Sequence, residues 1–369
     1  MDGRTDGTKG LMKTIEIAGR AIGPEAPPYV IAEISANHNG RMETAMRLID
    51  EAHQAGASAV KLQTYKPDTI TLNSDAEEFR IRGGLWDGRT LYDLYVEAHM
   101  PWDWHKPLFE RARTTGITIF SSPFDRTAVD LLEDLNAPAY KIASFEAVDL
   151  PLIRYVASTG KPMIISTGLA DAEEIAEAID AAKGAGCSQL AILHCVSGYP
   201  APAGDYNLQT IPDMMRRFGV VTGLSDHTLD NATAIASVAL GAAIIEKHFT
   251  LDRKGGGPDD SFSLEPQDLR ELCRNAKIAW EALGKVNYSQ KSSEASNAKF
   301  RRSLYFVKAL KAGDLITEDA VRSVRPGFGV PPKYWTSLIG RRIGRDVMQN
   351  TPVLKSDLEE EPAGKAGDL

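Results

Sequence analysis

Cysteine is scarce in this chain, and the few cysteines form no recognisable pattern. The three are Cys187, Cys195 and Cys273, an odd number in which no two are spaced as CxxC. This excludes a disulfide framework and predicts buried free thiols. Free thiols are typical of a reducing compartment, so we expect a cytoplasmic protein.

Long apolar runs and an excess of positive charge are also missing. No stretch reaches the roughly 18 apolar residues of a membrane helix. Residues 1–13 are polar and glycine-rich and lack the apolar core of a signal peptide, so we interpret them as a disordered tail. The net charge of −8 argues against nucleic acid or an anionic membrane as a partner. A small anionic substrate remains open, because a local cluster of lysines can outweigh the overall charge.

A repeat of apolar runs and amphipathic segments occupies most of the chain. Strands that are buried on both faces read as continuous apolar runs, and helix-like segments separate these runs. Eight such units in about 250 residues predict a (β/α)8 TIM barrel. An open doubly wound sheet is the alternative, but no glycine fingerprint follows the first run. The runs span residues 29–34, 59–65, 118–124, 139–145, 162–168, 190–196, 220–227 and 243–249.

The domain organisation follows from where this repeat begins, is interrupted and ends. We assign the barrel to residues 14–284, with an aromatic and glycine-rich insertion at 66–101 that lies on the active-site side as a lid or substrate wall. Polar, serine-rich residues 285–300 are predicted to be a linker. Short alternating runs in 301–357 predict a small β-rich domain, followed by a tail at 358–369.

Polar side chains gather where the predicted strands end, which is where TIM-barrel enzymes carry their chemistry. Core packing does not explain polar groups at the ends of six or more strands. The residues in question are Glu33, Lys61, Gln63, Ser122, Lys141, Ser144, Glu146, Ser166, Ser197, Tyr199, Ser225, His227, Glu246 and His248.

Two of these residues, His227 and His248, end the seventh and eighth strands. A single histidine at a strand end is more often a hydrogen-bonded structural residue than a ligand. Two on adjacent strand ends can instead share one divalent metal ion. Neutral imidazole with oxygen ligands suits manganese, iron, cobalt or zinc, so the residues leave the identity of the ion open.

Lysines inside apolar strands require an anionic partner. Lys61 and Lys141 are such residues, and a phosphate with serine donors beside it, or a carboxylate, would satisfy them. Asp259, in a glycine-rich loop, is either a turn residue or an acceptor for a substrate hydroxyl. A metal, a phosphate pocket and carboxylates together fit condensation of a phosphorylated three-carbon unit with an aldehyde. An aldolase that uses a lysine imine and a non-catalytic sugar-binding barrel remain the alternatives.

The strand-end motifs resemble, in order and spacing, those of the sialic acid synthase family. The motifs are IAEISANHNG, VKLQTY, FSSPFD, YKIASFE, ISTG, LHCVSGYP, GLSDHT, EKHF and GGPDDSFS. The resemblance covers about residues 29–355 and implies a C–C bond-forming transferase. Such enzymes condense phosphoenolpyruvate with an amino sugar to a nine-carbon 2-keto-3-deoxy acid and phosphate. The small C-terminal domain resembles the antifreeze-like (SAF) domain of that family.

The resemblance also implies a role for each matching residue. His227 and His248 would bind the metal, usually Mn²⁺ with Mg²⁺ or Co²⁺ as alternatives, and Glu33 would contact the reacting centre. Arg325 would reach from the C-terminal domain into the active site of the other subunit of a domain-exchanged homodimer. The residues that would bind phosphoenolpyruvate are Lys61, Ser122, Lys141, Ser144, Ser166, Ser197 and Ser225. The residues facing the sugar are Gln63, Glu146, Tyr199, Asp259 and Arg325.

The insertion and parts of the neighbouring motifs resemble one branch of the family, which uses 2,4-diacetamido-2,4,6-trideoxy-L-altrose. Ser197 stands where synthases of N-acetylneuraminate often carry asparagine, and this departure is consistent with a different sugar. Synthases of N-acetylneuraminate or legionaminate remain the alternatives within the family.

Overall fold

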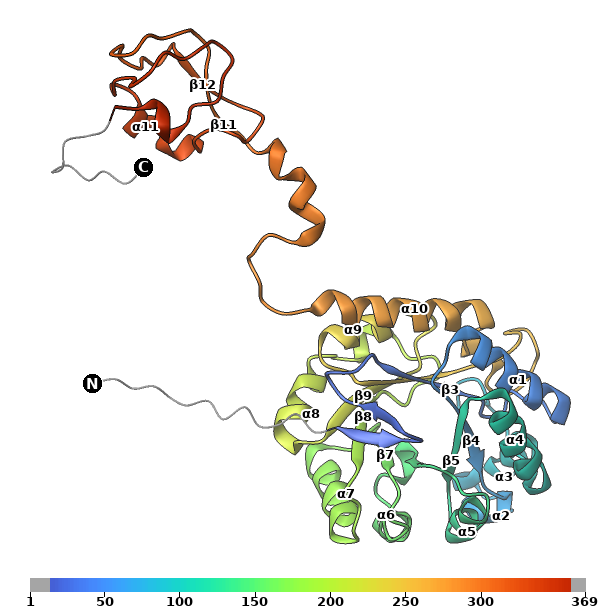
Figure 1. Cartoon of the computed structure of the whole chain (residues 1–369). Coiled ribbons are helices and arrows are strands. Elements are labelled where there is room, and N and C mark those ends of the chain that lie inside the picture. Colours follow the sequence, from blue (N-terminus) through green and yellow to red (C-terminus); the bar gives the residue numbers. More distant parts are fainter. Residues whose placement is uncertain (1–13, 360–369) are drawn as a thin grey trace, which may run out of the picture. The chain divides into compact units, whose positions relative to one another are not determined.

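The computed structural model describes residues 14–359, which divide after Gly284 into two compact units. The first unit is an eight-stranded parallel barrel ringed by helices, as the repeat predicted (Figure 1). The open doubly wound sheet is excluded, because the last strand pairs with the first and closes the ring. The barrel strands are β3 (Tyr29–Glu33), β4 (Ala59–Thr64), β5 (Thr118–Pro123), β6 (Tyr140–Ile142), β7 (Met163–Ser166), β8 (Leu190–Cys195), β9 (Val221–Asp226) and β10 (Ile244–His248).

A helix follows each barrel strand and covers it from outside (Figure 1). Local sequence signals mark the helix ends. Asp171 caps the helix after β7 in a capping box with Glu174, and Gly56 ends the first helix in the left-handed conformation at φ 89°. The helices of this unit are α1 (Met42–Ala55), α2 (Pro67–Ile70), α3 (Leu91–Ala98), α4 (Trp102–Thr115), α5 (Arg126–Asp134), α6 (Leu150–Ala157), α7 (Ala172–Gly184), α8 (Thr210–Phe218), α9 (Ala232–Ala239) and α10 (Pro266–Leu283).

A β-hairpin that the sequence analysis did not predict precedes the barrel. Strands β1 (Ile15–Ile17) and β2 (Arg20–Ile22) pair across Ala18 and Gly19, both at positive φ, as a tight two-residue turn requires. Its isoleucines are buried in one cluster with residues near the beginnings of the barrel strands, among them Tyr29, Phe120 and Ile164. The hairpin therefore closes the end of the barrel opposite the predicted site.

The insertion lies between β4 and α4, as predicted, and contains α2, α3 and an irregular segment. Within that segment, two backbone hydrogen bonds close a loop that carries Leu85 and Trp86: Ile81 donates to the Arg89 carbonyl at 2.8 Å, and Gly88 donates to the Ile81 carbonyl at 3.0 Å. Gly83, Gly84 and Gly88 of this loop all have positive φ, which glycine adopts without strain.

The second unit, residues 285–359 of the described chain, is built around its own apolar cluster, which includes Leu304, Phe306 and Val353. It contains the antiparallel pair β11 (Ser303–Phe306) and β12 (Val321–Val324) and the short α11 (Trp335–Leu338). Most of the predicted linker, Ser292–Phe300, forms a 3₁₀ helix. The unit continues beyond residue 357, since Leu358 bridges to Ile343.

The predicted tail at 1–13 and residues 360–369 of the predicted C-terminal tail lie outside the described residues. Between residues 14 and 359, no helix combines the length and the apolar character needed to cross a membrane.

Candidate functional site

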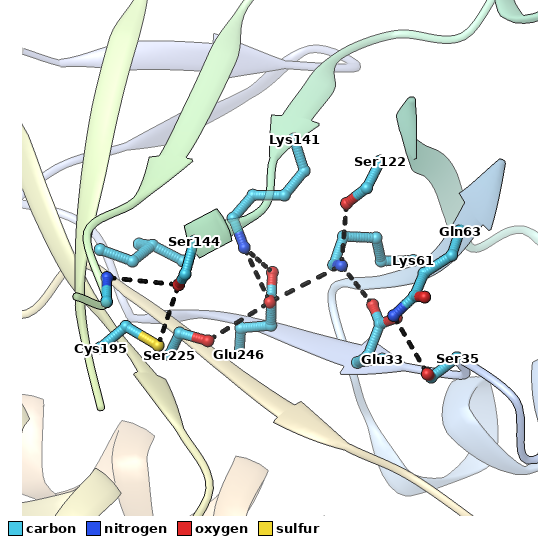
Figure 2. Close-up of polar contacts among 12 residues, drawn as sticks. Glu33, Ser35, Lys61, Gln63, Ser122, Lys141, Ser144, Cys195, Ser225 and Glu246 are labelled. Carbon is cyan, nitrogen blue, oxygen red and sulfur yellow. Dashed lines mark hydrogen bonds and ion pairs between the residues drawn. The ribbon is translucent and has the colours of Figure 1, made fainter. Parts of the chain in front are cut away.

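Four buried charges form a row across the inside of the barrel at the carboxyl ends of its strands (Figure 2). Glu33 on β3 lies 2.5 Å from the Nζ atom of Lys61 on β4. Glu246 on β10 contacts Lys141 on β6 at 2.8 Å and Lys61 at 3.7 Å. The two lysines thus find carboxylate partners, as burial in apolar strands requires, and the signs alternate along the row.

The row shifts the ionisation of its members. Burial is the largest influence on Glu33 and raises its pKa to about 7 against the opposing charge of Lys61. Burial alone would lower the pKa of Lys61, but the carboxylates of Glu246 and Glu33 outweigh it and the shift is upward. Glu246 is buried as well, yet Lys141 and Lys61 hold its pKa below the usual value. Burial lowers the pKa of Lys141 more than Glu246 raises it.

Serine hydroxyls surround one end of this row. Ser144 accepts a hydrogen bond from the backbone N–H of Gly168 at 3.2 Å. The Oγ atoms of Ser166 and Ser197 are buried without a hydrogen-bond partner among the described residues. A Cβ atom added at Gly168 would lie 2.2 Å from the Ser197 Oγ and 2.8 Å from the Ser144 Oγ. Because Gly168 has no Cβ, the hydroxyls of Ser144 and Ser197 lie close together beside it, a suitable arrangement for phosphate oxygens.

The remaining predicted phosphoenolpyruvate residues lie in the charged row itself (Figure 2). Ser122 accepts a hydrogen bond from Lys61 at 3.1 Å. Ser225 lies 3.5 Å from Glu246, to which its hydroxyl donates. All seven predicted residues therefore meet at one end of the barrel.

The two predicted metal ligands also meet: the ring centroids of His227 and His248 are 5.5 Å apart. Burial, then the positive charges of His227 and the lysines, lower the pKa of His248 well below its usual value, so the ring is neutral. Its Nδ1 atom is buried and has no hydrogen-bond partner within residues 14–359. A neutral imidazole with an unpartnered nitrogen is able to bind a metal ion.

Several contacts hold His227 in place. Its Nδ1 atom bonds to the carbonyl of Val196 at 2.7 Å, and its backbone N–H donates to the Tyr206 hydroxyl at 2.6 Å. The preceding residue, Asp226, receives a 2.8 Å hydrogen bond from Lys247, which also donates to the Thr228 and Asp230 carbonyls. Burial would lower the pKa of the His227 ring, but a hydrogen bond with the Cys195 side chain outweighs it and the shift is upward. With Nδ1 bound to a carbonyl, Nε2 is the nitrogen that would turn to a ligand in place of this thiol.

These observations fit a site in which two histidines supply the protein ligands. His227 and His248 would hold the ion, which would act there as a Lewis acid. The described chain offers no cluster of three or more histidine, cysteine or acidic residues with metal-binding geometry, so further ligands would be substrate and water oxygens.

The predicted sugar-facing residues lie around the histidines and the charged row. Gln63 donates to Glu33 and to Ser35, each at 3.0 Å. Asp259 accepts a hydrogen bond from Ser35 and lies 3.8 Å from the His248 Nδ1. The Tyr199 ring centroid is 4.3 Å from that of His227.

Glu146 and Arg325 are the other two residues predicted to face the sugar. Burial raises the pKa of Glu146 to about 7, and its Oε2 atom is buried without a hydrogen-bond partner in the described residues. Arg325 belongs to the second unit, just after β12, so its role in the site stays a prediction.

Three residues of the site had been given no role from the sequence. Glu246 lies between both lysines, and its position two residues before His248 on one strand was the available signal. Ser35 accepts a hydrogen bond from Gln63 and donates one to Asp259, which lies 224 residues further along the chain, so no local pattern reveals the contact. Cys195 had been predicted only to be a buried free thiol. It is buried as predicted, but its Sγ also accepts a hydrogen bond from Ser144 at 3.3 Å.

A barrel with this row of charges, hydroxyls and paired histidines has the features of the synthases that the motifs resemble. The chain belongs to the NeuB family, whose model matches residues 48–288. The SAF domain model matches residues 301–359. The resemblance to the sialic acid synthase family is thereby confirmed, in the barrel and in the C-terminal domain.

Two pseudaminic acid synthases and one solved structure are similar to this chain over most of its length. A pseudaminic acid synthase of Campylobacter jejuni serotype O:23/36 is 42% identical over 89% of this chain and 96% of its own length. The pseudaminic acid synthase of Helicobacter pylori is 40% identical over 90% of this chain and 98% of its own. Among solved structures, an N-acetylneuraminic acid synthetase of Leptospira borgpetersenii in complex with citrate matches with a TM-score of 0.70. The two sequences are 31% identical, and the match covers 79% of this chain and 96% of the Leptospira chain.

Proposed function

We propose that this protein is a pseudaminic acid synthase. It condenses phosphoenolpyruvate with 2,4-diacetamido-2,4,6-trideoxy-L-altrose and water to give pseudaminic acid and phosphate. The observation that carries the proposal is the alternating row Glu33–Lys61–Glu246–Lys141, at the same end of the barrel as a group of serine hydroxyls and two paired histidines. Similarity to pseudaminic acid synthases over nearly the whole chain supports this particular sugar.

The phosphate of phosphoenolpyruvate binds in the pocket formed by Ser144, Ser166 and Ser197, beside Lys141. The two unpartnered hydroxyls donate to phosphate oxygens. Lys141 and Lys61 balance the negative charge, which in a buried site is far less screened than in water. Substrate charge also favours the protonated form of Lys141, whose pKa burial depresses.

The sugar binds as its open-chain aldehyde beside His227 and His248. C3 of phosphoenolpyruvate attacks the aldehyde carbon, whose oxygen takes up a proton. The resulting cationic carbon C2 lies near the Glu33 carboxylate, which stabilises the developing charge. Water then adds to C2 and releases one proton, which balances the proton taken up by the aldehyde oxygen. The bond between C2 and the bridging oxygen breaks as the C2 hydroxyl becomes a carbonyl, and its proton leaves with the phosphate.

His227 and His248 are the residues that would hold a divalent metal, for which we propose manganese. When bound, such an ion polarises a carbonyl oxygen and makes its carbon more electrophilic. The contacts of Val196, Tyr206 and Lys247 keep the His227 ring oriented for this role.

The decisive experiment offers the protein phosphoenolpyruvate with a panel of amino sugars and identifies products by mass spectrometry while phosphate release is followed. We expect pseudaminic acid from the trideoxy altrose sugar and much slower reaction with N-acetylmannosamine. Preferred formation of N-acetylneuraminate or legionaminate would reassign the enzyme within its family. No phosphate release with any sugar, in buffers containing Mn²⁺, Co²⁺ or Mg²⁺, would refute the function.

Isotope labelling tests the route. With ¹⁸O at the bridging oxygen of phosphoenolpyruvate, the label is expected in the released phosphate, because the C2–O bond breaks. Label retained in the sugar acid would contradict this mechanism. A lysine-imine aldolase is disfavoured because Lys61 and Lys141 are both held by carboxylates, and borohydride trapping of a covalent adduct would reverse that judgement.

We further propose that the enzyme works in the cytoplasm as a domain-exchanged homodimer. All three cysteines lie in the described part of the chain and are free, in keeping with a reducing compartment. Arg325 would enter the partner's active site, a proposal tested below.

A further inference from the structure

The tip of the insertion contacts the rim of the site through one tryptophan. The indole N–H of Trp86 donates to the carbonyl of Pro258 at 3.0 Å. Pro258 directly precedes Asp259, which is buried beside His248. The Trp86 ring also lies near Tyr199, with centroids 5.8 Å apart and planes at 50°.

Tyr199 connects this tryptophan to the histidines. Its ring centroid is 4.3 Å from His227, 6.0 Å from His248 and 5.3 Å from Phe262. The rings therefore form a continuous aromatic wall, defined here as Trp86, Tyr199 and Phe262, that begins at the histidines and ends at the insertion. Strands β3, β4 and β6 contribute charged groups instead, namely Glu33, Lys61 and Lys141.

The two sides of the site suit different parts of a sugar. Hydroxyl and amide groups require hydrogen-bond partners, whereas methyl groups and C–H faces pack on aromatic rings. The aldehyde carbon reacts beside the histidines, and C6 is the far end of the six-carbon chain, roughly 6 Å away with bonds of about 1.5 Å. Trp86 lies at the corresponding end of the aromatic wall, one ring beyond Tyr199.

We propose that Trp86 is a specificity-determining residue, whose indole packs against C6 of the sugar and selects a 6-deoxy methyl group over a hydroxymethyl group. This inference rests on the proposed function and deepens it. A hydroxyl at C6 would be placed against an apolar ring and would lose a water partner without gaining another. The hydrogen bond to Pro258 fixes the indole relative to the Asp259 loop, so selection does not depend on a freely moving side chain.

The test compares Trp86→Ala and Trp86→Phe with wild-type enzyme, using the trideoxy altrose sugar and N-acetylmannosamine. KM and kcat are measured for each sugar and for phosphoenolpyruvate. In Trp86→Ala we expect the kcat/KM preference for the 6-deoxy sugar to fall about tenfold, the scale at which enzymes discriminate one small apolar group. The fall should come from a higher KM for that sugar, with the KM for phosphoenolpyruvate unchanged. Trp86→Phe, which keeps a smaller ring, should show an intermediate loss.

Trp280 provides a matched control. Its indole N–H on α10 donates to the carbonyl of Pro24, also at 3.0 Å. Trp280→Ala and Trp280→Phe remove the same kind of hydrogen bond at a site with no predicted substrate contact, so they should leave the sugar preference unchanged. An equal change of preference in both series would indicate a general structural effect and overturn the proposal.

Other outcomes separate this inference from the proposed function. Wild-type turnover with an unchanged sugar preference in both Trp86 variants would refute the role of Trp86 alone. If the wild type condensed neither sugar, the function would fail, and calorimetric binding of the same two sugars to the wild type and Trp86→Phe would still decide the inference. An unaltered affinity ratio there would overturn it.

Discussion

Among single residues, Glu246 has the central place in the site because it contacts both buried lysines. Its carboxylate lies 2.8 Å from Lys141 and 3.7 Å from Lys61. Removing one partner of a buried ion pair leaves an uncompensated charge and is strongly destabilising. The positive charges of the two lysines balance these buried carboxylates, and the same charges would attract a phosphorylated substrate.

Gly168 leaves room for the hydroxyls of Ser144 and Ser197. In Gly168→Ala, the added Cβ would come within 2.2 Å of the Ser197 Oγ and displace it. We expect the KM for phosphoenolpyruvate to rise at least tenfold, equivalent to about 1.4 kcal/mol of binding, with a much smaller change in the KM for the sugar. Steady-state kinetics with each substrate varied in turn measures this.

Gly184→Ala is the matched control, because a Cβ at Gly184 meets nothing within 4 Å. It should behave as wild type. A normal KM for phosphoenolpyruvate in Gly168→Ala would show that the phosphate binds elsewhere.

Glu146 is expected to make folding stability depend on pH. Burial raises its pKa from 4.5 to about 7, so the folded state binds the extra proton between these values. Its contribution to stability is full below pH 4.5 and is lost as the pH rises through 7. A glutamine side chain has no proton to lose in this pH range, so Glu146→Gln avoids this decrease in stability. The variant should be more stable than wild type at pH 8, by up to about 3 kcal/mol, since a tenfold change in proton affinity corresponds to about 1.4 kcal/mol.

Urea unfolding of both proteins between pH 4.5 and 8 measures the effect of Glu146. The advantage of the variant should shrink as the pH falls. The same substitution at exposed Glu177 on α7 controls for loss of one surface charge. A stability difference for Glu146→Gln that does not vary with pH would contradict a raised pKa.

At the scale of elements, strand register decides which side chains meet. Glu33 is paired with Lys61 across β3 and β4, and with His248 across β3 and β10. Because side chains alternate along a strand, Gln63 joins Lys61 inside the barrel, and Glu246 joins His248. Shifting any of these strands by one residue would turn its functional side chains outward.

The β1–β2 hairpin is the element that closes the other end of the barrel. Ile17 is completely buried there. Ile17→Ala should reduce the free energy of unfolding by about 2–5 kcal/mol, through lost burial and the cavity left behind. Denaturant unfolding measures the change, and Ile278→Ala, at a 53% exposed position on α10, should change stability by less than about 0.5 kcal/mol. Equal effects of the two substitutions would mean that the hairpin contributes nothing to barrel closure.

At the scale of the whole molecule, the chain forms two units with separate apolar cores, and the second begins with the segment 285–300 that leads to its core. Each unit buries its own cluster, so neither core requires side chains from the other. A short connecting segment between two such units is compatible with exchange of the smaller unit between subunits.

Complementation tests the exchanged dimer. His248→Ala and Arg325→Ala should each abolish most activity alone. Co-expressed with different tags, they should recover roughly a quarter of wild-type activity, because half of randomly assembled dimers are mixed and each has one intact site. Purification through both tags should enrich the activity. No recovery in doubly tagged dimers would mean that Arg325 serves the barrel of its own chain or no site at all.

The sequence by itself determined the barrel, the position of the insertion and most of the residues at the rim. Buried parallel strands must be apolar along their length, so eight runs were visible, and polar residues at their ends stood out. The β1–β2 hairpin was missed because three-residue strands are too short for a periodic pattern.

Only the tertiary structure decided which charges pair and which groups lie together. Glu246 meets Lys141 over 105 residues of sequence, and Trp86 meets Pro258 over 172. Barrel closure brings such residues together, and many pairings of two lysines with several carboxylates are equally compatible with the strand pattern. Local sequence reports which face of an element a side chain occupies, whereas the partner across the barrel depends on the register and the packing of all eight strands.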